Sequence, residues 1–323
     1  MKHKMGVLDE SVKENRMKDL LVRSEHNPLI SAADMPYPVN TVFNAGSVDL
    51  GDQVLLLLRV ESRSGRSHFT VARSSDGITN WQIENQPLSP GNDRPYEAYG
   101  VEDCRITRVD ELGAWVLAYT AYSQYGPAVA VATTRDFVDV EPLGVAFPPS
   151  NKDAAIFPRK IRGRYAMLHR PLAQDGNIWI AYSPDLVHWG ENNVVLPLHH
   201  GPWWDGSRVG TGIPPIETEY GWLILYHGIK NMPSGPIYRV GAALLDLDEP
   251  HRLVARTRHW LFGPEEPYER SGDVPNVVFP CGGFVRGDDL WVYYGAADSS
   301  ICLATGNIYD ILDAVRADPV TSH

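Results

Sequence analysis

A set of polar and charged residues stands at corresponding places in repeated stretches of this chain, several of them where a short apolar run ends. The set comprises Asn44, Arg59, Glu102, Asp103, Arg105, Lys152, Arg170, Arg208, His227, Tyr238 and Asp298. It joins one adjacent pair of acids to several cations, within a protein of 323 residues whose formal net charge is −11. Cations gathered against the overall charge of a protein indicate a site for an anion.

Two reactions would use such a set. A glycosidase needs two carboxylates that flank the scissile bond, one as acid and one as base or nucleophile. A phosphorolytic enzyme needs one acid, because phosphate itself attacks, and it needs cations that hold this dianion. Lys152, Arg170, Arg208 and His227 favour phosphorolysis. A protein that only binds carbohydrate would need no acid opposite these cations.

Ordinary ion pairing at the surface is the alternative for these cations. Arg170 and His227 argue against it, because each ends an apolar run. Lys152 and Arg208 lie in less regular sequence, so both interpretations stay equally open for them.

The elements that position this set come from a fivefold repeat. A glycine precedes a short apolar or aromatic run five times, at Gly51, Gly113, Gly163, Gly221 and Gly287. The runs cover 54–59, 115–120, 165–170, 222–227 and 290–294. The glycines recur at intervals of roughly 50–66 residues, too long for a helical solenoid unit and just above a usual propeller blade. The repeat therefore predicts small sheets in a radial arrangement.

The segments around each run support this interpretation. Short segments precede the runs at 43–46, 100–103, 155–158, 212–215 and 278–281, and alternating strands follow four of them at 69–72, 128–131, 178–181 and 240–243. Three of these strands lead into Ser/Thr-x-Asp turns at Asp76, Asp136 and Asp185, which close hairpins. We predict an all-β fold, a five-bladed β-propeller catalytic domain over 25–323, with an irregular β-sandwich as the alternative. The inner strand ends would meet in one funnel.

Both ends of the chain are predicted to carry a helix. Residues 1–24 are rich in Lys, Glu, Asp and Met, and apolar residues recur loosely at helical spacing. This N-terminal helical extension would pack on a neighbouring subunit and form a homo-oligomer, with a frayed tail or a helix on its own propeller as an equal alternative. Residues 308–315 are predicted as a brief closing helix.

Charge and composition exclude several classes of partner. The negative charge makes nucleic acid and anionic membranes poor partners. No stretch approaches the ~18 apolar residues of a membrane span, and the N-terminus has no apolar signal core, so we expect a cytoplasmic protein. Cys104, Cys281 and Cys302 are odd in number and lack metal-type spacing, so we expect buried, reduced thiols and no metal or cofactor.

Several of these segments resemble the signatures of glycoside hydrolase family 130. The resemblance runs from about Asn27 to Ile311 and includes every repeat. It is carried by Val101-Glu102-Asp103-Cys104-Arg105-Ile106, Asn151-Lys152-Asp153, Ile156-Phe157-Pro158-Arg159-Lys160-Ile161, Met167-Leu168-His169-Arg170-Pro171, Tyr226-His227-Gly228, Val277-Val278-Phe279-Pro280-Cys281 and Tyr293-Tyr294-Gly295-Ala296-Ala297-Asp298. It implies a five-bladed β-propeller of inverting β-mannoside phosphorylases, with a minority of β-mannosidases.

The resemblance also implies residue roles. Asp103 would be the general acid, which in the family is thought to protonate the glycosidic oxygen through the 3-hydroxyl of the mannosyl residue. Phosphate would attack the anomeric carbon from the opposite face and give α-mannose 1-phosphate. The phosphate-binding positions are matched by Lys152, Arg170, Arg208, His227 and Tyr238, and the mannose-binding positions by Asn44, Arg59 and Asp298.

The neighbours of Asp103 carry further expectations. Glu102 and Arg105 are candidates for substrate binding, but Glu102 is expected to matter less, since adjacent side chains on a strand point to opposite faces. Cys104 stands where Pro is usual in the family, and its side chain is expected to point away from the sugar. Lys152 stands where an Arg is also found, which replaces a planar fork by a point charge.

The complete cationic set, which the hydrolase branch lacks, favours a phosphorylase over a β-mannosidase. The form Glu102-Asp103-Cys104-Arg105 and the stretch 122–126 look closer to mannooligosaccharide and mannosyl-N-acetylglucosamine phosphorylases. The expected substrates are therefore inorganic phosphate and β-1,4-linked mannosides. Phosphorylases of β-1,2-mannosides or of mannosylglucose are the alternatives.

Overall fold

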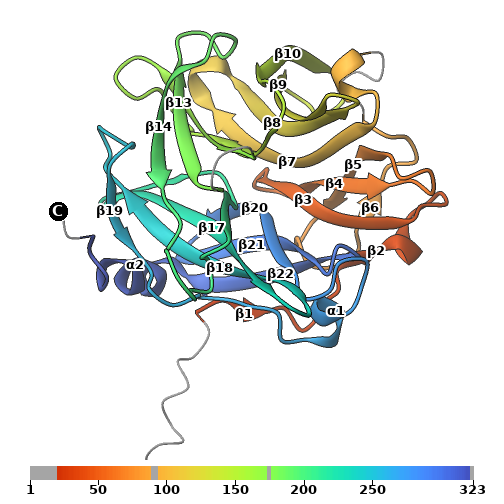
Figure 1. Cartoon of the computed structure of the whole chain (residues 1–323). Coiled ribbons are helices and arrows are strands. Elements are labelled where there is room, and N and C mark those ends of the chain that lie inside the picture. Colours follow the sequence, from red (N-terminus) through yellow and green to blue (C-terminus); the bar gives the residue numbers. More distant parts are fainter. Residues whose placement is uncertain (1–19, 89–93, 173–175, 321–323) are drawn as a thin grey trace, which may run out of the picture.

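Five blades of antiparallel strands surround a common centre (Figure 1), which confirms the predicted five-bladed β-propeller. One parallel pair, Ser67 with Gly100, links the first two blades into a single sheet. The computed structural model describes residues 20–88, 94–172 and 176–320. Blade 1 contains β3 (Thr41–Asp49), β4 (Val54–Glu61), β5 (Ser67–Ser74) and β6 (Gln82–Ile83), and blade 2 contains β7 (Gly100–Val109), β8 (Ala114–Ser123), β9 (Gly126–Thr134) and β10 (Val140–Phe147). Blade 3 contains β11 (Asn151–Ile156), β12 (Tyr165–Pro171), β13 (Ile178–Ser183) and β14 (Gly190–Leu196).

The last two blades depart slightly from this four-strand pattern. Blade 4 contains β15 (Arg208–Thr211), β17 (Gly221–Met232), β18 (Gly235–Leu245) and β19 (Leu253–Arg256), with β16 (Ile216–Thr218) paired to β17. Blade 5 contains β20 (Val278–Arg286), β21 (Asp289–Ala296) and β22 (Ser300–Asn307). In every blade the first strand is the inner one.

The five repeated glycines form the turns between inner and second strands. Their φ angles are all positive, at 91°, 58°, 80°, 137° and 64° in chain order. A side chain would be strained in this conformation, which explains why glycine recurs at each turn. The predicted hairpin turns are also present: Asp76 Oδ1 accepts hydrogen bonds from the N–H groups of Ile78 and Thr79, both at 2.8 Å.

The apolar runs become second strands because each is covered on both faces by a neighbouring blade. Leu55 and Leu57 of β4 pack with Leu117 and Tyr119 of β8. The residues between them, Leu56 and Leu58, face the other way, into a cluster with residues of blade 5. A half-exposed strand alternates apolar and polar residues, but a strand buried on both faces has no need of polar ones. These segments are therefore continuous apolar runs in the sequence.

Blade 5 is completed by the N-terminal part of the chain. β1 (Val22–Arg23) and β2 (Ile30–Ser31) both pair with β22, so segments from opposite ends of the chain share one sheet. The predicted helix over 1–24 is therefore wrong for Val22 and Arg23, because the edge of β22 offers main-chain partners and Leu21 beside them is buried. Residues 1–19 lie outside the described part of the chain.

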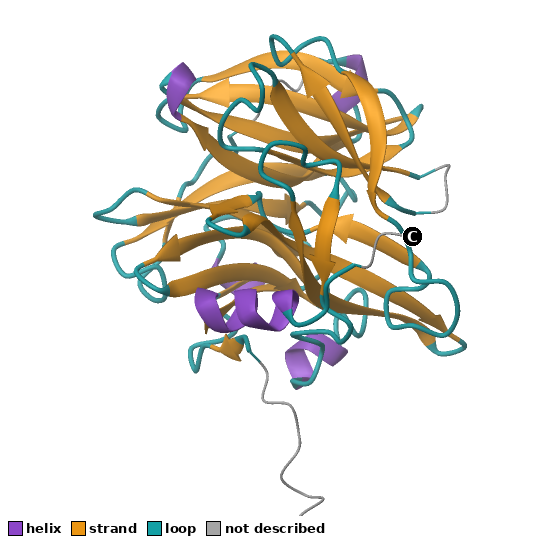
Figure 2. Ribbon diagram, turned by 90° about the vertical axis from the view of Figure 1, so that its left-hand side faces the viewer, coloured by secondary structure: helices purple, strands orange, loops and turns teal. Residues whose placement is uncertain are grey.

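Helices lie at the periphery of the strands (Figure 2). The closing helix is present as α2 (Ile308–Arg316), and the side chain of Asn307 caps it by accepting from the N–H groups of Tyr309 and Asp310. The other helical elements are α1 (Pro267–Arg270), η2 (Ala32–Asp34), η3 (Pro95–Glu97) and η4 (Asp110–Leu112). None of the helices within the described ranges is long and apolar enough to cross a membrane.

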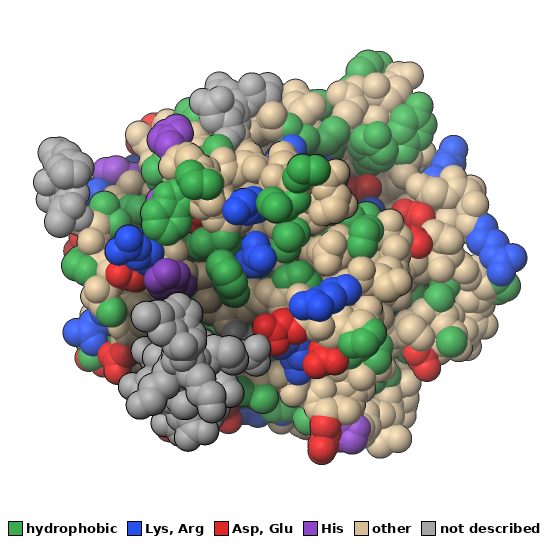
Figure 3. Space-filling model, turned by 60° about the horizontal axis from the view of Figure 1, so that its bottom comes forward, with side chains coloured by type: hydrophobic (Ala, Val, Ile, Leu, Met, Phe, Trp, Pro, Cys, Tyr) green, Lys and Arg blue, Asp and Glu red, His purple; other side chains and the backbone are tan. Residues whose placement is uncertain are grey.

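The three cysteines are buried and free. On the face in Figure 3, Lys and Arg side chains are interspersed with Asp and Glu, so the charge there is mixed rather than of one sign.

Candidate active site

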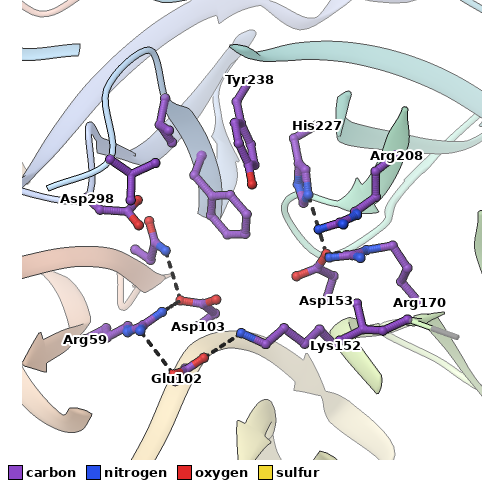
Figure 4. A pocket seen from close by; sticks show the side chains of 15 residues that line it. Arg59, Glu102, Asp103, Lys152, Asp153, Arg170, Arg208, His227, Tyr238 and Asp298 are labelled. Carbon is purple, nitrogen blue, oxygen red and sulfur yellow. Dashed lines mark hydrogen bonds and ion pairs between the residues drawn. The ribbon is translucent and has the colours of Figure 1, made fainter. Parts of the chain in front are cut away.

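A pocket of about 380 Å³ opens where the inner strands begin, at the centre of the ring (Figure 4). Its lining comprises Asn44, Arg59, Glu102, Asp103, Lys152, Asp153, Arg170, Leu172, Arg208, His227, Tyr238, Val274, Val277, Phe279 and Asp298. All the predicted site residues except Arg105 are among them. The five blades therefore bring together, as the repeat implied, side chains that are spread over most of the chain.

The lining divides into two parts by blade. Blades 1, 2 and 5 supply Asn44, Arg59, Glu102, Asp103 and Asp298, which we call the acid half. Blades 3 and 4 supply Lys152, Asp153, Arg170, Arg208, His227 and Tyr238, which we call the cation half.

Three residues at the same place in consecutive blades shape the pocket. Asn44, Asp103 and Asp153 have φ angles of 48°, 54° and 56°. Each lies at a bulge, where the pairing of the inner strand with the second strand shifts by one residue. Asn and Asp tolerate this left-handed conformation better than most residues, and a bulge redirects side chains that would otherwise alternate.

The bulge corrects our expectation for Glu102. Its side chain lines the pocket together with Asp103 instead of pointing to the opposite face. Glu102 Oε2 accepts from Lys152 Nζ at 2.7 Å, and Glu102 Oε1 lies 3.2 Å from Arg59 Nη2. Glu102 thus connects the acid half to the cation half, which strand alternation alone does not predict.

Asp103 is held as a carboxylate. Its Oδ1 accepts from Asn44 Nδ2 at 2.9 Å and from Arg59 Nη1 at 2.8 Å. Burial alone would raise the pKa of Asp103, but the charges of Arg59, Lys152 and Arg105 outweigh burial and lower this pKa below its ordinary value. In the free protein the side chain of Asp103 is therefore ionised at neutral pH.

Asp298 is the acid with the opposite tendency. It lies in the turn between β21 and β22 with φ of 51°, and its main-chain oxygen accepts from Thr41 Oγ1. Burial and, next, the negative charge of Asp103 raise the pKa of Asp298 to about 7. Asp103 is thus a carboxylate, whereas Asp298 holds a proton up to about neutral pH.

The cation half is organised around Asp153. Arg170 donates to Asp153 Oδ2 from Nε at 2.8 Å and from Nη2 at 2.5 Å, and both residues are almost fully buried. Arg170 Nη1 is also buried, and it has no hydrogen-bond partner among the described residues. A buried guanidinium donor without a protein partner, on a residue that lines the pocket, is suited to bind an anion.

His227 forms the buried wall of the cation half. Its ring lies against Phe279 and Tyr238, with centroid distances of 4.5 and 5.9 Å, and its Nε2 is 3.4 Å from Asp153 Oδ2. Burial lowers the pKa of His227, so the imidazole is neutral at pH 7. Arg208 also lines the pocket and is exposed.

Arg105 departs from the expected role in substrate binding. It is 1% exposed and donates to the main-chain oxygens of Asp103, Thr211 and Gly212. It therefore lies behind the pocket, where it holds the inner strand of blade 2 to blade 4. Cys104 points away from the pocket, as expected, and packs between blades 1 and 2.

Asp153 was missed by the sequence analysis. The signal was present, because Asn151-Lys152-Asp153 occupies in blade 3 the place of Val101-Glu102-Asp103 in blade 2. A comparison of the repeats with each other, residue by residue, would have found it.

Comparisons with known proteins agree with this architecture. A family model described as beta-1,4-mannooligosaccharide phosphorylase matches residues 13–317. The chain is 34% identical to a beta-1,2-mannobiose phosphorylase of Listeria innocua, over 92% of this chain and 99% of that protein. A solved structure of a Listeria innocua beta-1,2-mannobiose phosphorylase with beta-1,2-mannobiose bound is similar, with a TM-score of 0.85 over 92% of this chain and 99% of that chain.

Two further relatives differ in the linkage that their names specify. A 1,2-beta-oligomannan phosphorylase of Thermoanaerobacter is 39% identical over 76% of this chain and 80% of that protein. A beta-1,4-mannooligosaccharide phosphorylase of Ruminococcus albus is 33% identical over 93% of this chain and 92% of that protein. With a family model that spans nearly the whole chain and relatives of this similarity, the chain belongs to glycoside hydrolase family 130, a family of mannoside phosphorylases.

Proposed function

We propose that this protein is an inverting β-mannoside phosphorylase that cleaves its substrate with inorganic phosphate to give α-mannose 1-phosphate. The observation that carries the proposal is Arg170 Nη1, a buried cationic donor without a hydrogen-bond partner among the described residues, on a residue that lines the same pocket as the carboxylate of Asp103. A site for an anionic nucleophile and an acid for the leaving group are what phosphorolysis requires.

In this proposal the two halves of the pocket hold the two substrates. The mannosyl residue lies in the acid half against Asn44, Arg59 and Asp298, and phosphate lies in the cation half. A phosphate oxygen forms a bond to the anomeric carbon while the glycosidic bond breaks. The leaving oxygen receives the proton that Asp103 delivers, through the 3-hydroxyl of the mannosyl residue in the scheme implied by the family.

The lowered pKa of Asp103 fits this scheme once phosphate is included. Lys152 is one of the charges that lower this pKa in the free protein. A phosphate dianion beside Lys152 and Arg170 offsets their positive charge, so it raises the pKa of Asp103. Bound phosphate therefore shifts Asp103 toward its protonated form, which couples the two steps.

Hydrolysis is the second candidate, because Asp153 provides a further carboxylate in the pocket. An inverting glycosidase would use such a carboxylate as the base that activates water. The ion pair with Arg170 argues against this role, since it lowers the pKa of Asp153 and weakens it as a base.

A phosphate titration tests the reaction type. The protein is incubated with β-mannobiose, of either linkage, with and without inorganic phosphate, and the products are separated. We expect cleavage that depends on phosphate and yields mannose 1-phosphate of α configuration. Cleavage to free mannose at full rate in phosphate-free buffer would establish the hydrolase instead.

Two linkages have support as the bond that is cleaved. The β-1,4 bond is supported by the description of the family model and by the Glu102-Asp103-Cys104-Arg105 segment, and the β-1,2 bond by relatives at 34% and 39% identity. The reverse reaction distinguishes them. Incubation with α-mannose 1-phosphate and mannose, N-acetylglucosamine or glucose, followed by linkage analysis of the disaccharide, identifies both acceptor and bond.

A further inference from the structure

The cation half contains an anion at its centre. Asp153 is 2% exposed, yet it lines the part of the pocket that would receive phosphate. A carboxylate beside a phosphate site weakens phosphate binding by repulsion of like charges unless it has another effect that outweighs this cost. Its presence therefore needs a physical reason.

The geometry around Asp153 is tightly constrained. One oxygen, Oδ2, accepts both Nε and Nη2 of Arg170 and lies 3.4 Å from Nε2 of His227. The facing residue in blade 4 is Gly210, where a Cβ atom would lie 2.3 Å from this oxygen and 2.4 Å from the ring of His227. The three side chains therefore meet only because position 210 has no side chain.

We propose that Asp153 is a positioning residue of the phosphate site, which fixes Arg170 by one edge so that Nη1 faces the pocket. Arg170 carries five N–H groups, and the two-nitrogen contact to Asp153 determines the plane of the guanidinium. The same oxygen keeps the ring of His227 beside Arg170. This inference rests on the proposed function, since it assigns Nη1 to phosphate.

A second buried pair in blade 4 shows what a purely structural Asp–Arg contact looks like here. Arg256 donates to Asp205 Oδ2, to the hydroxyl of Tyr226 and to the main-chain oxygen of Pro197, so all three of its nitrogens have protein partners. Asp205 is fully buried and does not line the pocket. The Asp153–Arg170 pair differs from it because Arg170 Nη1 has no hydrogen-bond partner among the described residues.

Asp153→Asn tests the proposal, with Asp205→Asn as the matched control. The amide keeps the shape of the carboxyl group but loses its charge, so the charge-assisted contacts that fix the plane of the guanidinium are weakened. Because the amide oxygen can still accept from Arg170 and only the charge of Asp153 is lost, we expect the phosphate KM to rise about 3- to 10-fold, while the mannoside KM stays nearly unchanged. Asp205→Asn is expected to lower the melting temperature without changing either KM.

A double variant shows whether the effect acts through Arg170. Asp153→Asn added to Arg170→Ala should raise the phosphate KM no further than Arg170→Ala alone, because the group that Asp153 aligns is already absent. Independent, multiplying effects of the two substitutions would overturn the proposal. A lower phosphate KM in Asp153→Asn would also overturn it, since Asp153 would then act only as a repelling charge.

Two further measurements keep the test decisive. If Asp153→Asn does not fold, Arg170→Lys replaces it: one ammonium cannot both bind Asp153 with two nitrogens and reach phosphate, so its phosphate KM should approach that of Arg170→Ala. A wild-type phosphate KM in Arg170→Lys contradicts the proposal. Failure of the proposed function is recognised separately, because the wild-type protein would then cleave mannosides without phosphate and show no thermal stabilisation by inorganic phosphate.

Discussion

The two halves of the pocket treat their polar groups in opposite ways. In the acid half, Asp103 has two donors on one oxygen, and Glu102 lies between two cations. In the cation half, Arg170 is held on one edge and left open on the other. The first arrangement orients a carboxylate, whereas the second reserves a donor for a ligand. This difference supports the proposed place of phosphate, on the side of blades 3 and 4.

The comparison also explains why the two acids at equivalent bulges have different roles. Asp103 and Asp153 share a backbone conformation and a place in the repeat. Arg59 donates to Asp103 through one nitrogen, whereas Arg170 donates to Asp153 through two. We therefore assign proton delivery to Asp103 and alignment to Asp153.

Removal of the acid should have the largest effect. Asp103→Asn keeps the shape of the side chain but cannot deliver a proton, so we expect kcat to fall by about 10²–10⁴-fold. The measurement is kcat for phosphorolysis at saturating phosphate and mannoside. Cys104→Ser is the control, because Cys104 is adjacent but faces the blade core. A variant that retains more than about a tenth of the wild-type kcat would show that Asp103 is not the acid.

Truncation of one residue in each half should produce opposite kinetic profiles. Arg170→Ala removes a charge-assisted contact worth roughly 1.5–3 kcal/mol, so the phosphate KM should rise about 10- to 150-fold with little change for mannoside. Asp298→Ala should instead raise the mannoside KM. Each variant is titrated once with phosphate and once with mannoside. Identical profiles for the two variants would contradict the division of the pocket into an acid half and a cation half.

Glu102→Gln should have a smaller effect that involves both halves. Gln still offers one acceptor, but it loses the charge that holds Arg59 on one side and Lys152 on the other. We expect both KM values to rise by roughly 3- to 10-fold, equivalent to about 1 kcal/mol each. If only one KM changes, Glu102 belongs to one half and does not connect them.

The fold could be predicted from the sequence because its signals are local and repeated. Gly51 and its four counterparts mark turns that only glycine makes without strain, and the apolar runs report strands buried on both faces. The convergence of Asn44, Arg170 and His227 follows once the blades are placed in a ring. The direction of the side chains at a bulge is harder to predict from the sequence. It depends on a one-residue shift in the pairing of two strands, which no residue type specifies.

This limit explains the particular errors. The assignment of Glu102 to the opposite face assumes a regular strand, and the bulge at Asp103 breaks that regularity. Arg105 was placed with the substrate because it is charged and near Asp103, but its donors bind main-chain oxygens of a distant blade. Val22 and Arg23 fall within the predicted helix yet pair with β22, because a strand edge about 280 residues away determines their conformation.

Two acids of the acid half, Asp103 and Asp298, should have opposite effects on stability as a function of pH. The pKa of Asp298 is raised to about 7, so the folded protein takes up a proton that the unfolded chain has already lost above about pH 4. Stability therefore falls as pH rises from about 4 to 7, and Asp298→Asn, which cannot ionise, should melt a few degrees higher than wild type at pH 8 and at nearly the same temperature at pH 5. The pKa of Asp103 is lowered, so its carboxylate stabilises the fold above about pH 4, and Asp103→Asn should melt lower than wild type at pH 8. Melting curves of the three proteins at both pH values test this. Equal shifts of the same sign in both variants would show that the two carboxyl groups share one environment, and that the contrast in their pKa values is absent.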